Sequence, residues 1–333
     1  MTGWLDRFQQ KHTWAGFPIA VVYKYADDQG NYLAALITYY GFLSLFPLLL
    51  LLSTVLGIAL AGNVELQRQI LDSTLSQFPV IGEQLGDPQG LQSGGVGLVI
   101  GILGTIYGGM GVAQAVQNAM NIIWSVPRAK RPNPILLRLR SLLLIATVGL
   151  AVLGTTILSA LGSSAAAFGA NLGSGVKVAV TALAVVLNAG IFVLAFKVAT
   201  ARGLAVRDIV PGALIAVLVW QLLQSFGAAY IGHVVKNASA TNGVFALVLG
   251  LIAWLFIEAC AVVLGVEVNV VRAQRLHPRA LLTPFTDNVD LTRADERAYA
   301  QYAEAQQSKG FQTVDVSFDK PPAPATEDTA RDR

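Results

Sequence analysis

The sequence has a single cysteine and little charge. Cys260 lies inside an apolar run, so the chain can form no internal disulfide and has no thiolate cluster for a metal. Charged residues make up 13% of the 333 residues, whereas an ordinary soluble domain has about 25%. Apolar residues make up 54%, and the mean hydropathy is +0.57. This composition argues against a soluble protein and favours one surrounded by lipid.

Long stretches of the chain have no charged side chain. They run over residues 31–64, 88–127, 141–176 and 209–232. About 20 helical residues, at about 1.5 Å each, span the hydrocarbon core of a bilayer. We therefore predict an all-α polytopic membrane protein with six transmembrane helices, at about 32–60, 95–124, 136–162, 176–197, 208–232 and 243–271.

The positions of the basic residues predict the orientation of these spans. Short cytoplasmic loops retain Lys and Arg, whereas translocated loops lose them. One set of connections carries Arg7, Lys11 and Lys24; Arg128, Lys130, Arg131, Arg138 and Arg140; Lys197, Arg202 and Arg207; and Arg272, Arg275 and Arg279. The opposite set carries only Arg68, Lys177 and Lys236. Six spans keep the four basic groups on one side, with both termini in the cytoplasm.

The remaining segments divide the chain into three regions. Residues 1–31 mix charges with aromatic side chains and predict a cytoplasmic interfacial helix, although a poorly ordered N-terminus is the alternative. The six-span domain covers 32–275, with its longest external loop at about 61–94. Residues 276–333 form a cytoplasmic tail, in which Thr292 and Asp295 resemble a capping box and the end is expected to be disordered.

A polar stripe runs along the second predicted span. Its members follow at spacings of three and four residues and so share one face of a helix: Tyr107, Gly111, Gln114, Asn118 and Asn121. Such side chains cannot stably face hydrocarbon. Helix packing, favoured by Gly104, Gly108 and Gly111, and a substrate path are the two interpretations.

The sixth predicted span carries Glu258 near its middle. A carboxylate there must be paired, solvated or protonated, so it either marks a polar path or makes a helix–helix hydrogen bond while protonated. Asn269 shares its face, whereas Glu267 points the other way and is expected to pair with a basic loop residue. Gln221 and Gln224 form a smaller polar patch on the fifth span.

Proline interrupts the first span at Pro47. Its ring lacks an N–H and clashes with the carbonyl of Leu43, which predicts a kink or break near the middle of the membrane. Broken helices line binding sites in some transporters, but a purely structural kink is the other interpretation.

Strong catalytic patterns are missing from the sequence. Its three histidines, His12, His233 and His277, fall in separate segments and predict no metal site. No P-loop, dinucleotide turn or nucleic-acid motif occurs. We therefore predict no enzyme activity, no catalytic residues, no cofactor, no metal and no nucleic-acid partner.

Four motifs in order resemble the YihY/BrkB family, and within it the YhjD type. They are DDQGNYLAALITYYGFLSLFPLLLLL, AVQNAMNIIWSV, RDIVPGA and LIAWLFIEACAVVLGVEVNVV. The last has LGVEVN where the family pattern is closer to LGAELN, and Glu267 and Asn269 match it. The resemblance implies a six-span bacterial inner-membrane protein. The family once carried a ribonuclease label, which these residues do not support chemically.

Two functions are consistent with these features. The polar stripe, Pro47 and Glu258 favour a transporter or flippase-like permease for a lipid or other amphipathic substrate, with membrane lipids as partners. The lack of a recognisable ion-coupling site favours a non-transporting scaffold or envelope-integrity protein. Ribonuclease activity is a distant third.

Overall fold

The computed structural model describes residues 2–59, 95–149, 174–237, 240–286 and 289–319, and all regular secondary structure in them is helical. The predicted external loop and the end of the tail lie outside these residues. The helices are α1 (Thr2–Lys11), α2 (Thr13–Asp27), α3 (Gly30–Ala59), α6 (Gly95–Ile123), the 3₁₀ turn η2 (Arg128–Lys130), a helical segment at 134–149, α8 (Ser174–Ala199), α9 (Val206–Asn237), α10 (Ala240–Ala273) and α11 (Arg293–Ala305).

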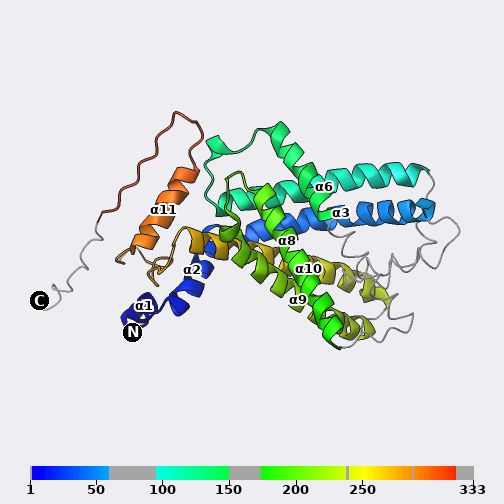
Figure 1. The fold of residues 1–333 in the computed structure, drawn as a ribbon, viewed down its shortest axis with the longest axis horizontal. Helices are drawn as coiled ribbons and strands as arrows, with labels where there is room; N and C mark the ends of the chain where they lie inside the picture. Colours follow the sequence, from blue (N-terminus) through cyan, green and yellow to red (C-terminus); the bar gives the residue numbers. More distant parts are fainter. Residues whose placement is uncertain (1, 60–94, 150–173, 238–239, 287–288, 320–333) are drawn as a thin grey trace, which may run out of the picture.

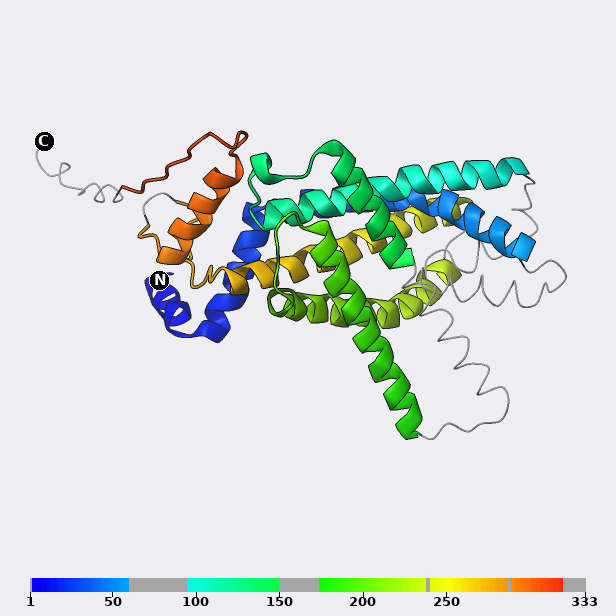
Figure 2. The same cartoon turned by 45° about the horizontal axis from the view of Figure 1, so that its top comes forward.

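Each predicted span falls on a long helical segment, which confirms the helices themselves. α3, α6, α8, α9 and α10 match five spans, and 134–149 covers the start of the third. Within the described residues, Val206–Leu223 of α9 and Val248–Ala273 of α10 are long and apolar enough to cross a membrane. In the ribbon, α3, α6, α9 and α10 run along the long axis, whereas α8 crosses obliquely (Figures 1 and 2).

Glycines allow α3 and α6 to approach closely. A Cβ built on any of three glycines of α6 would come within 2.8 Å of an α3 side chain. The pairs are Gly104 with Pro47, Gly108 with Ser44, and Gly111 with Tyr40. These glycines therefore lie at a close helix contact, and the pairing order shows that the two helices are antiparallel.

The helix does not break at Pro47. α3 continues from Gly30 to Ala59 through this residue, which excludes the predicted break, and the predicted kink stays a prediction. The Pro47 ring lies against Gly104 on α6. Because a glycine faces it, the ring can be accommodated at the helix interface without displacing a side chain.

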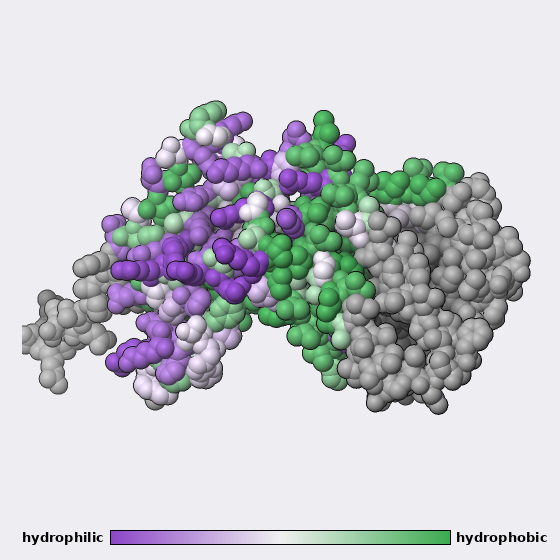
Figure 3. All heavy atoms as spheres, viewed as in Figure 1, coloured by the Kyte–Doolittle hydropathy of each residue, from purple (hydrophilic) through white to green (hydrophobic). Residues whose placement is uncertain are grey.

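The surface is divided between an apolar and a polar part. In Figure 3, hydrophobic residues cover the described part of the long helices, and hydrophilic residues cover the end that carries α1, α2 and α11. Many large apolar side chains are exposed, including Leu43, Leu103, Leu143, Leu218 and Phe226. Soluble monomers rarely expose so large an apolar surface. Together with the long apolar helices, it indicates an integral membrane protein.

At the polar end of the molecule, the N-terminal helices contact the C-terminal part of the chain. α1 and α2 pack beside the segment after α10, and α11 completes this layer (Figure 1). Gln9 of α1 donates to the Arg279 carbonyl, while Trp4 and Trp14 remain 67% and 72% exposed. The predicted N-terminal interfacial segment is thus two helices, with one face packed on protein and aromatic side chains on the other.

The capping box predicted at the start of α11 is confirmed. The Thr292 hydroxyl accepts from the Asp295 N–H at 3.2 Å, and the Asp295 carboxylate accepts from the Thr292 N–H at 3.0 Å. The same hydroxyl donates to the Pro278 carbonyl at 2.8 Å. The cap therefore also fixes α11 to the segment that follows α10.

Candidate functional site

A cavity of about 310 Å³ lies between α3, α6 and the connection that follows α6. Its lining is Leu36, Tyr40, Gly111, Gln114, Ala115, Asn118, Asn121, Arg131 and Leu137. Gln114, Asn118 and Asn121 therefore lie together, as their spacing predicts. Tyr107 is 72% exposed and does not line the cavity. Gly108 faces α3, and Tyr107 comes one residue before it. The Tyr107 side chain therefore points about 100° away from that direction around the helix axis.

Two of the amides are fixed by hydrogen bonds. The Asn121 side chain is buried, and its Oδ1 accepts from the N–H of Ala201, just after α8, at 2.9 Å. The Asn118 Oδ1 accepts from Arg131 Nη1 at 3.4 Å. Asn121 therefore holds two elements together, while Asn118 orients a charged group at the cavity.

Arg131 is the one charged residue that lines this cavity. Its Nε donates to the Val126 carbonyl at 3.2 Å, which turns the side chain back from the loop toward α6. The described residues place no carboxylate within ion-pairing distance of it. Burial, and after it the charge of Arg128, lowers the pKa of Arg131, but a guanidinium remains charged at neutral pH. The cavity thus combines amides with an arginine that has no acidic partner among these residues.

In the sequence, Arg131 serves only as one of the basic residues that predict the topology. Its part in the cavity depends on the path of the loop from 124 to 133, which no local spacing encodes. The positive φ of 50° at Ser125 belongs to the turn that ends α6 and directs the chain back along it.

Gln117 is another polar residue of α6 that lies outside the predicted stripe. It is fully buried one residue before Asn118, and its Nε2 donates to the Ser141 hydroxyl at 2.9 Å. This bond joins α6 to the helical segment 134–149. Gln117 is therefore a packing residue behind the cavity wall.

Glu258 lies apart from this cavity. Its side chain is buried on α10, and its Oε1 has no hydrogen-bond partner among the described residues. The indole N–H of Trp254, one helical turn earlier, is a polar group that interacts with the Glu258 carboxyl. The described residues do not bring Glu258 to the α6 stripe, and its two interpretations stay predictions.

Asn269 makes a helix–helix contact. Its Oδ1 accepts from the N–H of Gly212 on α9 at 2.7 Å. A Cβ on Gly212 would lie 1.8 Å from the Gly265 carbonyl oxygen, so the two backbones nearly touch. Two of the quoted motifs, RDIVPGA and LGVEVN, therefore meet at this crossing.

Of the polar patch predicted on α9, the structure describes the side chain of Gln221. Gln221 is half-buried and takes part in an interaction, but it is not among the lining residues. The side chain of Gln224 lies outside the described part of the structure.

Glu267 is fully buried beneath the polar end, beside an ion pair. Lys24 of α2 donates to the Asp28 carboxylate and, at 3.2 Å, to the Ile123 carbonyl at the end of α6. Glu267 interacts electrostatically with both Lys24 and Asp28. The described residues do not form the expected ion pair between Glu267 and a basic loop residue. The cation that acts on Glu267 is Lys24, which is on a helix and paired with Asp28.

The same cluster continues into α11. The Tyr302 hydroxyl donates to Asp28, and the Lys24 ammonium lies 5.0 Å from the centre of the Tyr302 ring. Burial, and after it the charge of Asp28, raises the pKa of Tyr302, so the phenol stays a neutral donor. Nearby, Arg279 contacts Asp27 at 3.1 Å and pairs with Asp295.

These features define a helical integral membrane protein with a polar cavity among its long helices and a charged layer at one end. Residues 21–288 match the family described as virulence factor BrkB. The chain therefore belongs to the BrkB family, which confirms the resemblance found in the motifs. The closer likeness to the YhjD type stays a prediction.

One curated relative is the Bacillus subtilis (strain 168) protein YfkH, which is named ribonuclease-like. It is 22% identical over 277 residues, which cover 76% of this chain and 93% of YfkH. No solved structure matches the chain significantly.

Proposed function

We propose that this chain is a transporter or flippase-like permease for a lipid or another amphipathic substrate. The cavity beside α6 is the observation that carries the proposal. Its amides and Arg131 suit a polar, anionic headgroup, and its volume of about 310 Å³ is at the lower end for small-molecule sites. It fits a headgroup rather than a whole lipid.

The outer surface beside the cavity suits an acyl chain. Leu36 lines the cavity and is 39% exposed, and Leu136 and Leu139 are exposed next to the lining residue Leu137. A substrate with its headgroup against Arg131 would keep its tail in contact with apolar side chains. This arrangement supports an amphipath over a fully soluble substrate.

The proposal includes six spans, a bacterial inner-membrane location and both termini in the cytoplasm. The four basic groups are linked at one end of the bundle: Lys24 to Ile123, Ala129 to Gln307, Asn121 to Ala201, and Arg272 to Arg207. The uncharged lengths of α3 and α6, 30 and 29 residues, are also sufficient to cross a bilayer.

A non-transporting scaffold is the second candidate. The glycine contacts between α3 and α6 favour it, because they bring the two helices into close contact at three positions. We propose no enzyme activity, since the cavity lining has no carboxylate or imidazole to act as a general acid or base. The ribonuclease-like description is that of YfkH.

Reconstitution into liposomes tests transport. The full chain should accelerate the exchange of a fluorescent anionic phospholipid between leaflets, measured by bleaching with a membrane-impermeant reductant. Arg131→Gln should slow the exchange about tenfold or more, while Arg138→Gln, which removes an exposed charge outside the cavity, should not. Equal rates for wild type, Arg131→Gln and empty liposomes would reject transport of this lipid class.

Thiol labelling separates the two candidates further. In a Cys260→Ser background, a cysteine introduced by Gln114→Cys should react with a membrane-impermeant thiol reagent from one side. A cysteine at the lipid-exposed position, Leu143→Cys, should not. Protection at position 114 in well-inserted protein would favour the scaffold, because packed helices exclude both water and reagent.

A further inference from the structure

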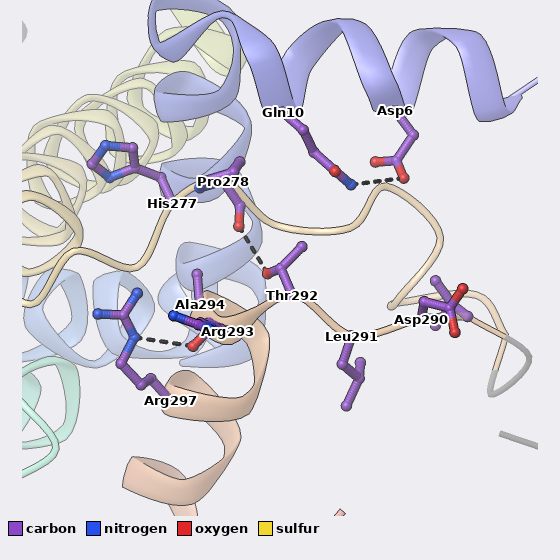
Figure 4. Close-up of a pocket in the computed structure, with 11 residues that line it drawn as sticks. Asp6, Gln10, His277, Pro278, Asp290, Leu291, Thr292, Arg293, Ala294 and Arg297 are labelled. Atoms are coloured by element: carbon purple, nitrogen blue, oxygen red, sulfur yellow. Dashed lines mark hydrogen bonds between the residues drawn. The ribbon is translucent and has the colours of Figure 1, made fainter. Parts of the chain in front are cut away.

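A second hollow, of about 810 Å³, lies where α10 ends and α11 begins. Its lining is Arg272, Arg275, His277, Arg293, Glu296 and Arg297. Four of these six residues are arginines, and one is acidic. Figure 4 shows the adjoining hollow, which shares His277, Arg293 and Arg297, around the point where the Pro278 segment meets the start of α11.

Two of the four arginines, Arg272 and Arg297, are held by backbone carbonyls and are not neutralised by an ion pair. Arg272 Nη1 donates to the Arg207 carbonyl at 3.0 Å, and Arg297 Nε donates to the Arg293 carbonyl at 3.0 Å. None of the four takes part in an ion pair that the described residues form. The backbone carbonyls orient Arg272 and Arg297 without cancelling their charge, so the N–H groups that these bonds leave free can bind an anion.

Arginine clusters of this kind suit phosphate. A planar guanidinium offers parallel N–H donors that match two oxygens of a phosphate group. Two arginines come from each side, Arg272 and Arg275 from the end of α10, and Arg293 and Arg297 from α11. A phosphate between them would relieve the repulsion among like charges brought into one hollow.

The position of the hollow favours a lipid source for that phosphate. Arg272 lies in the last turn of the apolar stretch Val248–Ala273, which places the arginines where a span would leave the hydrocarbon. Basic clusters directly after a transmembrane helix bind anionic headgroups. RNA is less favoured, because the lining has no Phe, Tyr or Trp on which a base could stack.

We infer that this hollow binds the phosphate headgroup of an anionic phospholipid and so fixes α11 at the membrane surface. The site shares no lining residue with the cavity beside α6. The inference therefore does not depend on transport, and either can fail without the other.

Lipid titration of the purified full chain in neutral-detergent micelles tests the inference. Phosphatidylglycerol should raise the thermal unfolding midpoint, whereas phosphatidylcholine should not. Arg293→Gln/Arg297→Gln should raise the apparent Kd for phosphatidylglycerol at least tenfold. Arg138→Gln/Arg202→Gln removes the same charge from exposed positions outside the hollow and should leave the Kd unchanged.

Further variants and ligands decide the source of the phosphate. Arg293→Lys/Arg297→Lys keeps the charge but loses the paired N–H donors of the guanidinium, so we expect an intermediate Kd. This variant also tests the site if the Gln variant fails to fold. Equal weakening by the control pair would show a diffuse surface effect and overturn the site. Saturable binding of inorganic phosphate or of a short single-stranded RNA, with no response to phosphatidylglycerol, would overturn the lipid assignment.

Discussion

Asn269 of α10 accepts a hydrogen bond from the backbone N–H of Gly212 on α9 at 2.7 Å, at a crossing where no side chain fits on Gly212. The bond and the close approach depend on each other. A larger residue at position 212 would separate the helices and leave the buried Asn269 amide without this donor.

We therefore expect Gly212→Ala to destabilise the protein. The added Cβ would lie 1.8 Å from the Gly265 carbonyl oxygen, and overpacking of this kind costs about 1–3 kcal/mol or more. Thermal unfolding in detergent should show a lower midpoint. Gly190→Ala on α8 is the matched control, because a Cβ there meets nothing within 4 Å, and it should not lower the midpoint. Equal midpoints for the two variants would contradict the close crossing.

Reporter fusions test the proposed topology. Fusions after Arg131, Arg202 and Arg279 should report the cytoplasm, and fusions near Glu83 and Lys236 the external side. The physical basis is the retention of Lys and Arg in cytoplasmic loops. An external signal after Arg202, with the other fusions as expected, would rule out the six-span arrangement.

The Pro47→Ala variant should insert normally and impair function. The change removes the ring that faces Gly104 and restores a backbone N–H, so α3 can straighten and its contact with α6 loosens. The lipid-exchange rate in liposomes is the measurement, with expression level as the measure of insertion. Pro18→Ala, in α2 at the polar end, is the control. An unchanged rate for Pro47→Ala would make the proline incidental to function.

Ionisation of Asp27 should destabilise the polar end as the pH rises. Burial raises the pKa of Asp27, and the charge of Arg279 only partly offsets this effect. A raised pKa in the folded state means that the stability contributed by the protonated form is lost as the pH rises through the folded pKa. Between about pH 4, near the ordinary pKa of aspartate, and pH 7, the wild-type midpoint should therefore fall relative to that of Asp27→Asn. A parallel pH dependence of the two proteins would contradict the shift.

Local pattern predicted much of the fold but only part of the site. Charge-free runs located the long helices, and a spacing of three and four residues brought Gln114, Asn118 and Asn121 to one cavity. Arg131 could not be found this way, because a loop returns it to α6, where its Nη1 donates to Asn118. Tyr107 fits the same spacing, but the pattern does not reveal which part of the helix face a neighbour covers.

The contacts within the charged layer could not be predicted from the sequence for a different reason. The sequence pattern predicts an interfacial helix for the segment that contains Lys24. For the segment that contains Glu267, it predicts an apolar transmembrane span. Their proximity depends on α2 packing against α10, and on Tyr302 reaching Asp28 from α11. Such long-range contacts between isolated polar residues leave no periodic trace along the chain.

The bond from Tyr302 to Asp28 joins residues 274 positions apart, and Arg279 contacts Asp27 across 252 positions. During synthesis, Asp27 and Asp28 leave the ribosome long before Arg279 and Tyr302 are made. The polar layer can therefore close only after all the long helices have been synthesised. Its formation is a late step of biogenesis, and a chain interrupted before α11 would leave Asp28 without the Tyr302 hydroxyl.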